Sequence, residues 1–340
     1  MKKYFISAML SALLFLTGCS AESSPEPVQG TFFAMDTMMD FTIYGESGLI
    51  DQSESLIASL ESLVSVTDTG SELYAINQTG SGTLTGKASS LMEQALEICR
   101  RTDGALDLSI YPIVRAWGFT TGSYQVPDEA EIQALLPLVD YRKIQYDAAT
   151  GTVTVTLPEG MEIDLGSVAK GYTGQLAAQM LREHGVQSAL LNLGGNVQTV
   201  GTKPDGSPWQ IGIKDPQGED AMMVLSVEDQ AVVTSGGYER YFEQDGQTYW
   251  HIMDPSTGHP ADSGLISVTI VGDEGVVCDG LSTALFVMGL EKAADLWAQS
   301  GDFEAVFVTA SGEVYITEGL RDHFALTERY ADTPVSVIER

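Results

Sequence analysis

Residues 249–260 read Tyr-Trp-His-Ile-Met-Asp-Pro-Ser-Thr-Gly-His-Pro, a short apolar run followed at once by a tight corner. The aromatic and aliphatic residues at the start of this run predict a short strand. The turn follows because Pro255 fixes φ and Gly258 admits a positive φ. His251 and Asp254 are then held beside a rigid corner, where side chains can face a cleft. Taken alone, the same pattern also describes an ordinary strand that ends in a turn.

The chain around this corner is strongly acidic. Its 340 residues carry 17 Lys and Arg against 47 Asp and Glu, a formal net charge of -30, with 44% hydrophobic residues. Such a charge argues against nucleic acid or an anionic lipid surface as the main partner, because both would be repelled. The same charge means that an anionic ligand needs a metal ion or a few well-placed cations.

The N-terminus has the pattern of an export signal. Lys2 and Lys3 precede the apolar run 5–16, which is short for a permanent membrane span. The run ends in Leu-Thr-Gly-Cys at 16–19, which resembles a bacterial lipoprotein cleavage site. We therefore expect a signal peptide at 1–18, a lipidated Cys19 and an extracytoplasmic, membrane-anchored protein, since two or more lipid chains anchor stably. A plain secretory signal with an incidental cysteine is the alternative.

The remainder of the chain predicts one compact α+β unit, which could divide into two lobes. Residues 19–29 are small, acidic and proline-bearing, as in a flexible tether, and we place the folded domain at 30–330 with a C-terminal tail at 331–340. Strands and amphipathic helices alternate through 30–330 without an internal repeat. Cys99 and Cys278 lie in apolar surroundings and predict buried free thiols, although one disulfide between them is also compatible with export.

Two stretches have the residue types of a phosphate and metal site. Asp164 and Lys170 bracket a glycine-containing turn at the start of a predicted helix, where free N–H groups favour phosphate. Asp279 and Thr283 stand four residues apart in another helix, so both oxygens face one side and suit Mg²⁺. Each stretch could instead be simple helix capping. The four histidines show no metal-ligand spacing, which disfavours zinc.

Eight segments occur in an order that resembles the FAD:protein FMN transferase (ApbE) family. The resemblance covers roughly residues 30–320, and each segment is weak alone but specific in register with the others. The segments are Met35-Asp36-Thr37, Ser71–Asn77, Leu106-Asp107-Leu108 with Pro112 and Trp117-Gly118-Phe119, Ile163–Tyr172, Asn192–Asn196, Thr234-Ser235-Gly236, His251–Pro260 and Asp279–Gly289.

This resemblance implies a fold and a set of site residues. The fold would be a single ApbE-like (T-fold-related) domain of mixed and antiparallel sheets flanked by helices. His251 would be the catalytic base, and Mg²⁺ would be held by Asp279, Thr283 and the carbonyl of Ser167. The residues implied to contact FAD are Met35, Tyr74, Ala105, Leu106, Asp107, Asp164, Lys170 and Ile252.

The chain departs from the family pattern at three positions. Asp36 stands where glycine is usual, Gly280 where alanine is common, and Ser167 where glycine or alanine is frequent. None removes a side-chain ligand, because Ser167 would act through its backbone. Asp36 leaves open the course of the loop on the isoalloxazine side.

The implied activity is Mg²⁺-dependent cleavage of FAD, with FMN attached through a phosphodiester to a Thr or Ser hydroxyl of an acceptor protein and AMP released. The implied partners are FAD as substrate and an exported or membrane redox subunit as acceptor. Two rival functions use the same diphosphate site: an Mg²⁺-dependent FAD pyrophosphatase that gives FMN and AMP, and a flavin-binding lipoprotein without turnover. A solute-binding protein is the least specific alternative.

Overall fold

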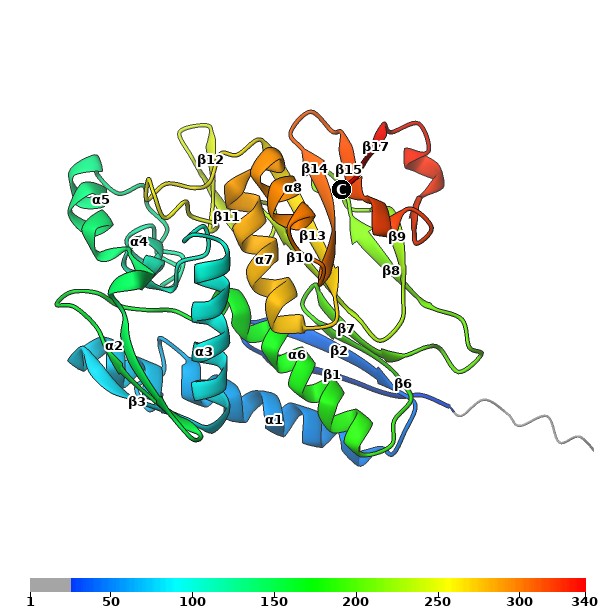
Figure 1. Cartoon of the computed structure of the whole chain (residues 1–340), viewed down its shortest axis with the longest axis horizontal. Coiled ribbons are helices and arrows are strands. Elements are labelled where there is room, and N and C mark those ends of the chain that lie inside the picture. Colours follow the sequence, from blue (N-terminus) through cyan, green and yellow to red (C-terminus); the bar gives the residue numbers. More distant parts are fainter. Residues whose placement is uncertain (1–25) are drawn as a thin grey trace, which may run out of the picture.

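The structure is a computed structural model that describes residues 26–340. Its central element is a nine-stranded sheet in which every neighbouring pair is antiparallel except the last, β15 and β17 (Figure 1). In spatial order its strands are β1 (Val28–Ala34), β2 (Thr37–Ile43), β6 (Ser188–Leu193), β7 (Asn196–Gly201), β10 (Ala231–Gly236), β13 (Leu265–Gly272), β14 (Phe303–Thr309), β15 (Val314–Thr317) and β17 (Val335–Ile338).

Both faces of this sheet are covered in its middle, which explains the sequence of β13. That strand reads Leu-Ile-Ser-Val-Thr-Ile-Val-Gly and is buried at seven of its eight positions. Alternate side chains of a strand point to opposite faces. Accordingly Val268 and Ile270 pack against helices, whereas Val271 packs against a second sheet. A strand that is apolar on both faces therefore marks the centre of the molecule.

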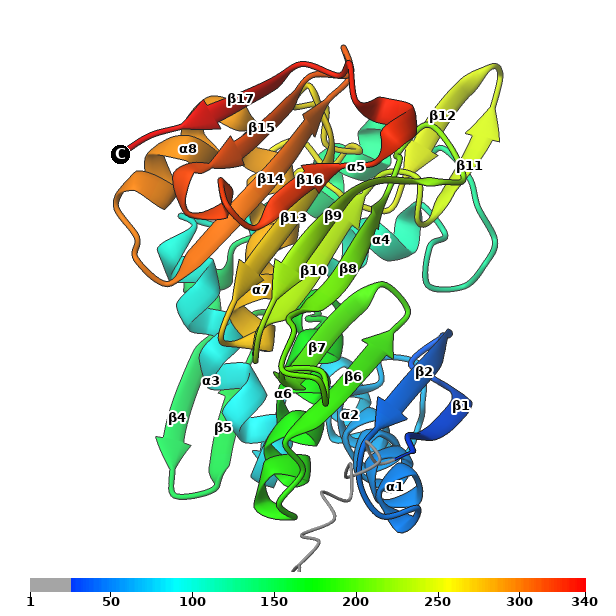
Figure 2. The same ribbon diagram turned by 90° about the vertical axis from the view of Figure 1, so that its right-hand side faces the viewer.

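The second sheet has three strands and lies across the nine-stranded sheet on the face away from the helices (Figure 2). It consists of β16 (Phe324–Leu326), β9 (Ala221–Val227) and β8 (Trp209–Lys214). Two smaller units complete the strands: a three-stranded sheet of β3 (Ser81–Thr85), β5 (Thr152–Thr156) and β4 (Gln145–Ala149), and a hairpin of β11 (Tyr241–Gln244) and β12 (Gln247–Trp250).

The helices cover the other face of the central sheet and extend beyond it (Figure 1). They are α1 (Gly48–Val64), α2 (Glu72–Thr79), α3 (Gly86–Arg101), α4 (Tyr111–Ala116), α5 (Glu129–Leu135), α6 (Gly166–Glu183), α7 (Gly275–Met288) and α8 (Leu290–Ala298). Short 3-10 turns lie at Leu108–Ile110, Leu136–Leu138, Tyr141–Lys143, Glu318–Leu320 and Glu328–Tyr330. Helices α6 and α7 carry the segments that the sequence associates with phosphate and metal.

Helices α6 and α7 meet at two glycines that leave no room for a side chain. A Cβ on Gly171 would lie 2.1 Å from the carbonyl oxygen of Gly275, and a Cβ on Gly275 would lie 2.4 Å from the carbonyl oxygen of Gly171. Real Cβ atoms do not approach backbone oxygens so closely, so the two helices pack backbone to backbone. This contact brings the second turn of α7, with Asp279, against the start of α6.

Gly171→Ala should therefore destabilise the protein by about 2–3 kcal/mol, because the added methyl group meets backbone that cannot rotate away. Urea unfolding followed by circular dichroism measures this change. Gly48→Ala is the control, since Gly48 is also a helical glycine but a Cβ there meets nothing within 4 Å. Equal stability of the two variants would show that α6 and α7 can separate at no cost.

Most elements expected from the sequence are present, and the α+β class is confirmed. The predicted break at Met35-Asp36-Thr37 is the turn between β1 and β2. Cys99 and Cys278 are both buried free thiols, so the alternative of a disulfide is excluded. In the described residues 26–340, no helix is long and apolar enough to span a membrane.

The structure corrects two boundaries and one interpretation. Strand β1 begins at Val28, inside the predicted tether, and the predicted tail contains strand β17, which pairs with β15. Helix α7 begins at Gly275, so Asp279 lies in its second turn and does not cap it. The capping interpretation of Asp279 is therefore wrong. The predicted signal peptide and Cys19 lie outside the described residues.

Candidate active site

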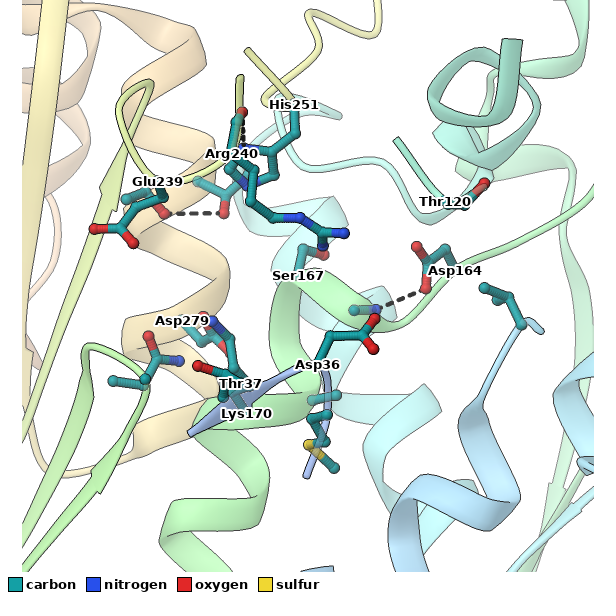
Figure 3. Close-up of a pocket in the computed structure, with 18 of the residues that line it drawn as sticks. Asp36, Thr37, Thr120, Asp164, Ser167, Lys170, Glu239, Arg240, His251 and Asp279 are labelled. Atoms are coloured by element: carbon teal, nitrogen blue, oxygen red, sulfur yellow. Dashed lines mark hydrogen bonds between the residues drawn. The ribbon is translucent and has the colours of Figure 1, made fainter. Parts of the chain in front are cut away.

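An open cleft of about 380 Å³ lies where the β1–β2 turn, the start of α6, the end of β10 and helix α7 converge. Figure 3 shows its polar side chains pointing toward a common space. The sequence-predicted residues that line it are Met35, Asp164, Ser167, Lys170, His251, Asp279 and Thr283. These residues come from four segments that are distant in sequence, at 35, 164–170, 251 and 279–283.

The β1–β2 turn places Met35 and Asp36 at the rim of this cleft. Both residues have positive φ, at 50° and 58°, which aspartate tolerates better than most side chains. The Met35 N–H donates to Glu61 Oε1 at 3.0 Å, which ties the turn to helix α1. Aspartate at position 36 is therefore compatible with the tight turn, where the ApbE resemblance led us to expect glycine.

Asp279 is the buried carboxylate of the site. Its side chain is 6% exposed, and its Oδ2 accepts the N–H of Gly171 at 2.8 Å. In a regular helix the Gly171 N–H would donate to the carbonyl of Ser167, four residues earlier. The Asp279 carboxylate therefore approaches the part of α6 toward which the Ser167 carbonyl points, and both residues line the cleft. Burial raises the pKa of Asp279, and the nearby Lys170 opposes that rise.

The donor set at this point fits Mg²⁺. Thr283 follows Asp279 by one helical turn, and its Oγ1 lies 3.3 Å from Ser235 Oγ on β10. A carboxylate, a hydroxyl and a backbone carbonyl are hard oxygen ligands, and Mg²⁺ completes such sets with water and phosphate oxygens. No group of three or more His, Cys, Asp or Glu with metal-site spacing occurs within residues 26–340. A magnesium site with one carboxylate is consistent with that finding.

The charges lining the cleft are unbalanced. Five carboxylates line it, those of Asp36, Glu61, Asp164, Glu239 and Asp279, against the two cations Lys170 and Arg240. A diphosphate would be repelled by such a lining unless a metal ion neutralised part of it. The Asp164 Oδ1 accepts the N–H of Gly166 at 2.9 Å, so this carboxylate also stabilises the start of α6.

His251 is positioned by backbone. Its N–H donates to the Arg240 carbonyl at 3.0 Å, and its Nδ1 lies 3.2 Å from the same oxygen. Because a carbonyl only accepts, the neutral ring must carry its proton on Nδ1, which leaves Nε2 free as a base. The ring packs 6.3 Å from the Phe119 ring. Desolvation, together with the charges of Arg240 and Lys170, lowers the pKa of His251 to about 4.

The pH dependence of activity should reflect this low pKa. His251 is neutral, and so able to accept a proton, at every pH above about 4. The kcat/KM for the anionic substrate, which reports the free enzyme, should therefore show no inflection near pH 6.5, the usual pKa of histidine. Initial rates between about pH 5 and 8 measure this. A tenfold loss per pH unit below 6.5 would mean that His251 is solvated and its pKa ordinary.

Comparison with known proteins agrees with this geometry. The sequence profile of the ApbE family matches residues 35–307, which is most of the chain. The chain belongs to the ApbE family.

Relatives with assigned names cover nearly the whole domain. An FAD:protein FMN transferase of Klebsiella pneumoniae is 35% identical over 285 residues, spanning 82% of this chain and 88% of that protein. One of Treponema pallidum is 34% identical over 290 residues, spanning 80% of each chain. The crystal structure of the ApbE protein of Thermotoga maritima superposes with a TM-score of 0.81 at 31% identity, covering 88% of this chain and 99% of that one. The predicted ApbE-like fold is confirmed.

Five residues expected from the ApbE resemblance to contact FAD do not line the cleft. Ile252 is buried in the core beside α7, and Leu106 is buried against α3 and α6. Asp107 uses both oxygens internally: Oδ1 accepts the N–H and hydroxyl of Ser109, and Oδ2 accepts the N–H of Tyr141. Ala105 is partly buried against the same core, and Tyr74 is partly buried. Contact of these five with FAD stays a prediction.

Sequence reasoning did not single out Arg240 or Glu239, both of which line the cleft, and it named Ser235 only as part of a family segment. One signal could have found Arg240. Asp245-Gly246 is a strong hairpin turn between two short apolar runs. Folding the chain at that turn pairs Tyr241 with Trp250 and places Arg240 opposite His251.

Proposed function

We propose that this protein is an FAD:protein FMN transferase that attaches FMN to a Thr or Ser hydroxyl of an acceptor protein and releases AMP. The observation that carries the proposal is the convergence of Lys170, Asp279, Thr283 and His251 on one cleft in a chain of the ApbE family. The curated relatives that match most of the chain bear this activity as their name.

The residues around Asp279 would hold Mg²⁺, with ligands from the Asp279 carboxylate, the Thr283 hydroxyl and the Ser167 carbonyl. A bound Mg²⁺ supplies neutralisation of the diphosphate and of the charge that develops as it is cleaved. Lys170 adds a second positive charge on the same side of the cleft. It lies near Asp279, since its charge opposes the rise that burial causes in the pKa of Asp279. Together these groups let a cleft lined mainly by carboxylates accept a dianionic substrate.

The reaction itself is a displacement at phosphorus. The acceptor hydroxyl oxygen attacks the phosphorus that bears the riboflavin moiety, and a new P–O bond forms. The bond from that phosphorus to the bridging oxygen breaks, and AMP leaves with the electron pair. His251 Nε2 takes the proton of the attacking hydroxyl, a role that its Nδ1–H contact with the Arg240 carbonyl prepares.

One experiment separates this function from its rivals. The soluble domain is incubated with FAD and Mg²⁺, with and without an acceptor protein that gains FMN on co-expression, and AMP and FMN are quantified. A transferase releases AMP in step with FMN bound to the acceptor. A pyrophosphatase releases AMP and free FMN regardless of acceptor, whereas a flavin-binding protein releases neither. Either of the last two results would reject the proposal.

We further propose that the mature protein starts at Cys19, carries lipid there and acts on the extracytoplasmic side of a bacterial membrane. The support is the sequence alone: the pattern at 16–19 and the preceding apolar run. The acceptor would then be an exported or membrane redox subunit. Mass spectrometry of the mature N-terminal peptide tests this, and a chain that retains residues 1–18 or bears an unmodified Cys19 would contradict it.

A further inference from the structure

Arg240 differs from the other arginines of the described chain. Seven of them form ion pairs with a carboxylate within 4 Å, and Arg340 lies over the Trp297 ring. Within residues 26–340, Arg240 has no carboxylate that close. Its one recorded side-chain hydrogen bond runs from Nη2 to the Phe119 carbonyl at 3.2 Å. In a chain with 47 acidic residues, an arginine without an ion pair requires an explanation.

The guanidinium of Arg240 lies inside the cleft. It is part of the cleft lining, and in Figure 3 it projects from beside His251 toward Ser167 and Asp164. Its charge contributes to the low pKa of His251 and opposes the rise that burial causes in the pKa of Asp164, which places it near each of them. Four of its five N–H donors remain available for a ligand.

The backbone of Arg240 fixes where that guanidinium can reach. The carbonyl of Arg240 accepts two hydrogen bonds from His251, so the proposed base and this cation belong to one rigid unit at the base of the β11–β12 hairpin. The contact with Phe119 secures the guanidinium from the other side. Any phosphorus whose incoming hydroxyl is within reach of His251 is therefore also close to Arg240.

We propose that the Arg240 guanidinium binds the phosphoryl group that is transferred, and so is a catalytic residue for the reaction proposed above. This inference depends on that proposed function. Lys170 and the groups around Asp279 neutralise the diphosphate from the α6–α7 side, whereas Arg240 faces it from the His251 side. A planar guanidinium donates two parallel hydrogen bonds to phosphate oxygens, which lysine does not. Negative charge on those oxygens is thereby stabilised as the P–O bond to AMP breaks.

Three variants test the role of the side chain while leaving the Arg240 carbonyl in place. Arg240→Gln should lower kcat/KM for FMN transfer about a hundredfold, the usual effect of removing one preorganised donor. Arg240→Lys should have a kcat/KM between those of wild type and Arg240→Gln, since it keeps the charge but not the two-point contact. In Arg240→Ala, added guanidinium ion should restore part of the rate. Arg115→Gln, which breaks an ion pair outside the cleft, is the matched control and should leave the rate unchanged.

Two further readouts separate catalysis from a structural tether to Phe119. Thermal unfolding should be nearly unchanged in Arg240→Gln. The acid limb of its kcat/KM profile should shift toward pH 6.5, because a cation near His251 is gone. Loss of rate with a lowered melting temperature and no guanidinium rescue would overturn the inference, as would a rate within twofold of wild type. Absence of FMN transfer by the wild-type protein itself would instead reject the proposed function.

Discussion

His251→Asn should lower the rate of FMN transfer at least about a hundredfold and leave FAD binding within a few-fold of wild type. Asparagine can donate from its amide to the Arg240 carbonyl as His251 Nδ1 does, so the local backbone should be preserved. What the substitution removes is the free Nε2 that accepts the proton of the attacking hydroxyl, and a positioned base contributes about 10²–10⁴ in rate. FAD affinity is measured by flavin fluorescence and transfer by the mass of the acceptor.

The matched control is the other histidine of the same corner. His259 Nε2 lies 3.2 Å from Glu129 Oε2, on the side of Trp117 and helix α5, and it does not line the cleft. His259→Asn should therefore transfer FMN at the wild-type rate. Equal loss of activity in both variants would show that the corner responds to packing changes and that neither ring acts as a base.

Asp279→Asn should change stability in opposite directions without and with Mg²⁺, and it should also reduce FMN transfer. Without metal the variant should be more stable than wild type, because asparagine keeps the shape and removes a charge that is 6% exposed and has no ion pair within the described residues. With excess Mg²⁺ the order should reverse, since the wild type gains stability from binding and the variant does not. FMN transfer should fall about a thousandfold or more, because the diphosphate loses its main neutralising group. Melting temperatures with and without Mg²⁺ measure the first two effects.

Asp36→Asn is the control for Asp279→Asn. It removes one negative charge from the same cleft, and asparagine tolerates the positive φ of 58° at that position. Its response to Mg²⁺ should match that of the wild type. If Asp36→Asn also lost the Mg²⁺-dependent rise in melting temperature, the metal would be held at the rim by the general charge of the cleft rather than by Asp279.

The sequence was most informative where local chemistry determines local structure. The turn at Met35-Asp36, the start of α6 after Asp164 and the two oxygens on one side of α7 follow from residue spacing alone. Their convergence does not follow from spacing. It depends on the contact between Gly171 and Gly275, which stand more than a hundred residues apart and give no local signal. The family resemblance supplied that long-range information.

Spacing alone also does not tell how a polar side chain in a loop is used. Asp107 was expected from the ApbE resemblance to contact FAD, and in the structure its oxygens accept the N–H groups of Ser109 and Tyr141. Arg240 reads as one more surface cation, yet it lines the cleft without an ion pair. Which use applies is decided by partners far away in the chain, such as Tyr141 and Phe119. The spacing of residues in the sequence does not predict these contacts.

Strand β1 has a consequence for where such an enzyme can work. It enters the fold at Val28 and ends at Ala34, immediately before the turn whose residues line the cleft. The strand spans about 20 Å, and the residues between a lipid-bearing Cys19 and Val28 reach at most about 30 Å when fully extended. If Cys19 is lipidated as proposed, this tether would keep the cleft within about 50 Å of the bilayer. Only acceptors that present their hydroxyl within that distance could then be modified without release of the anchor.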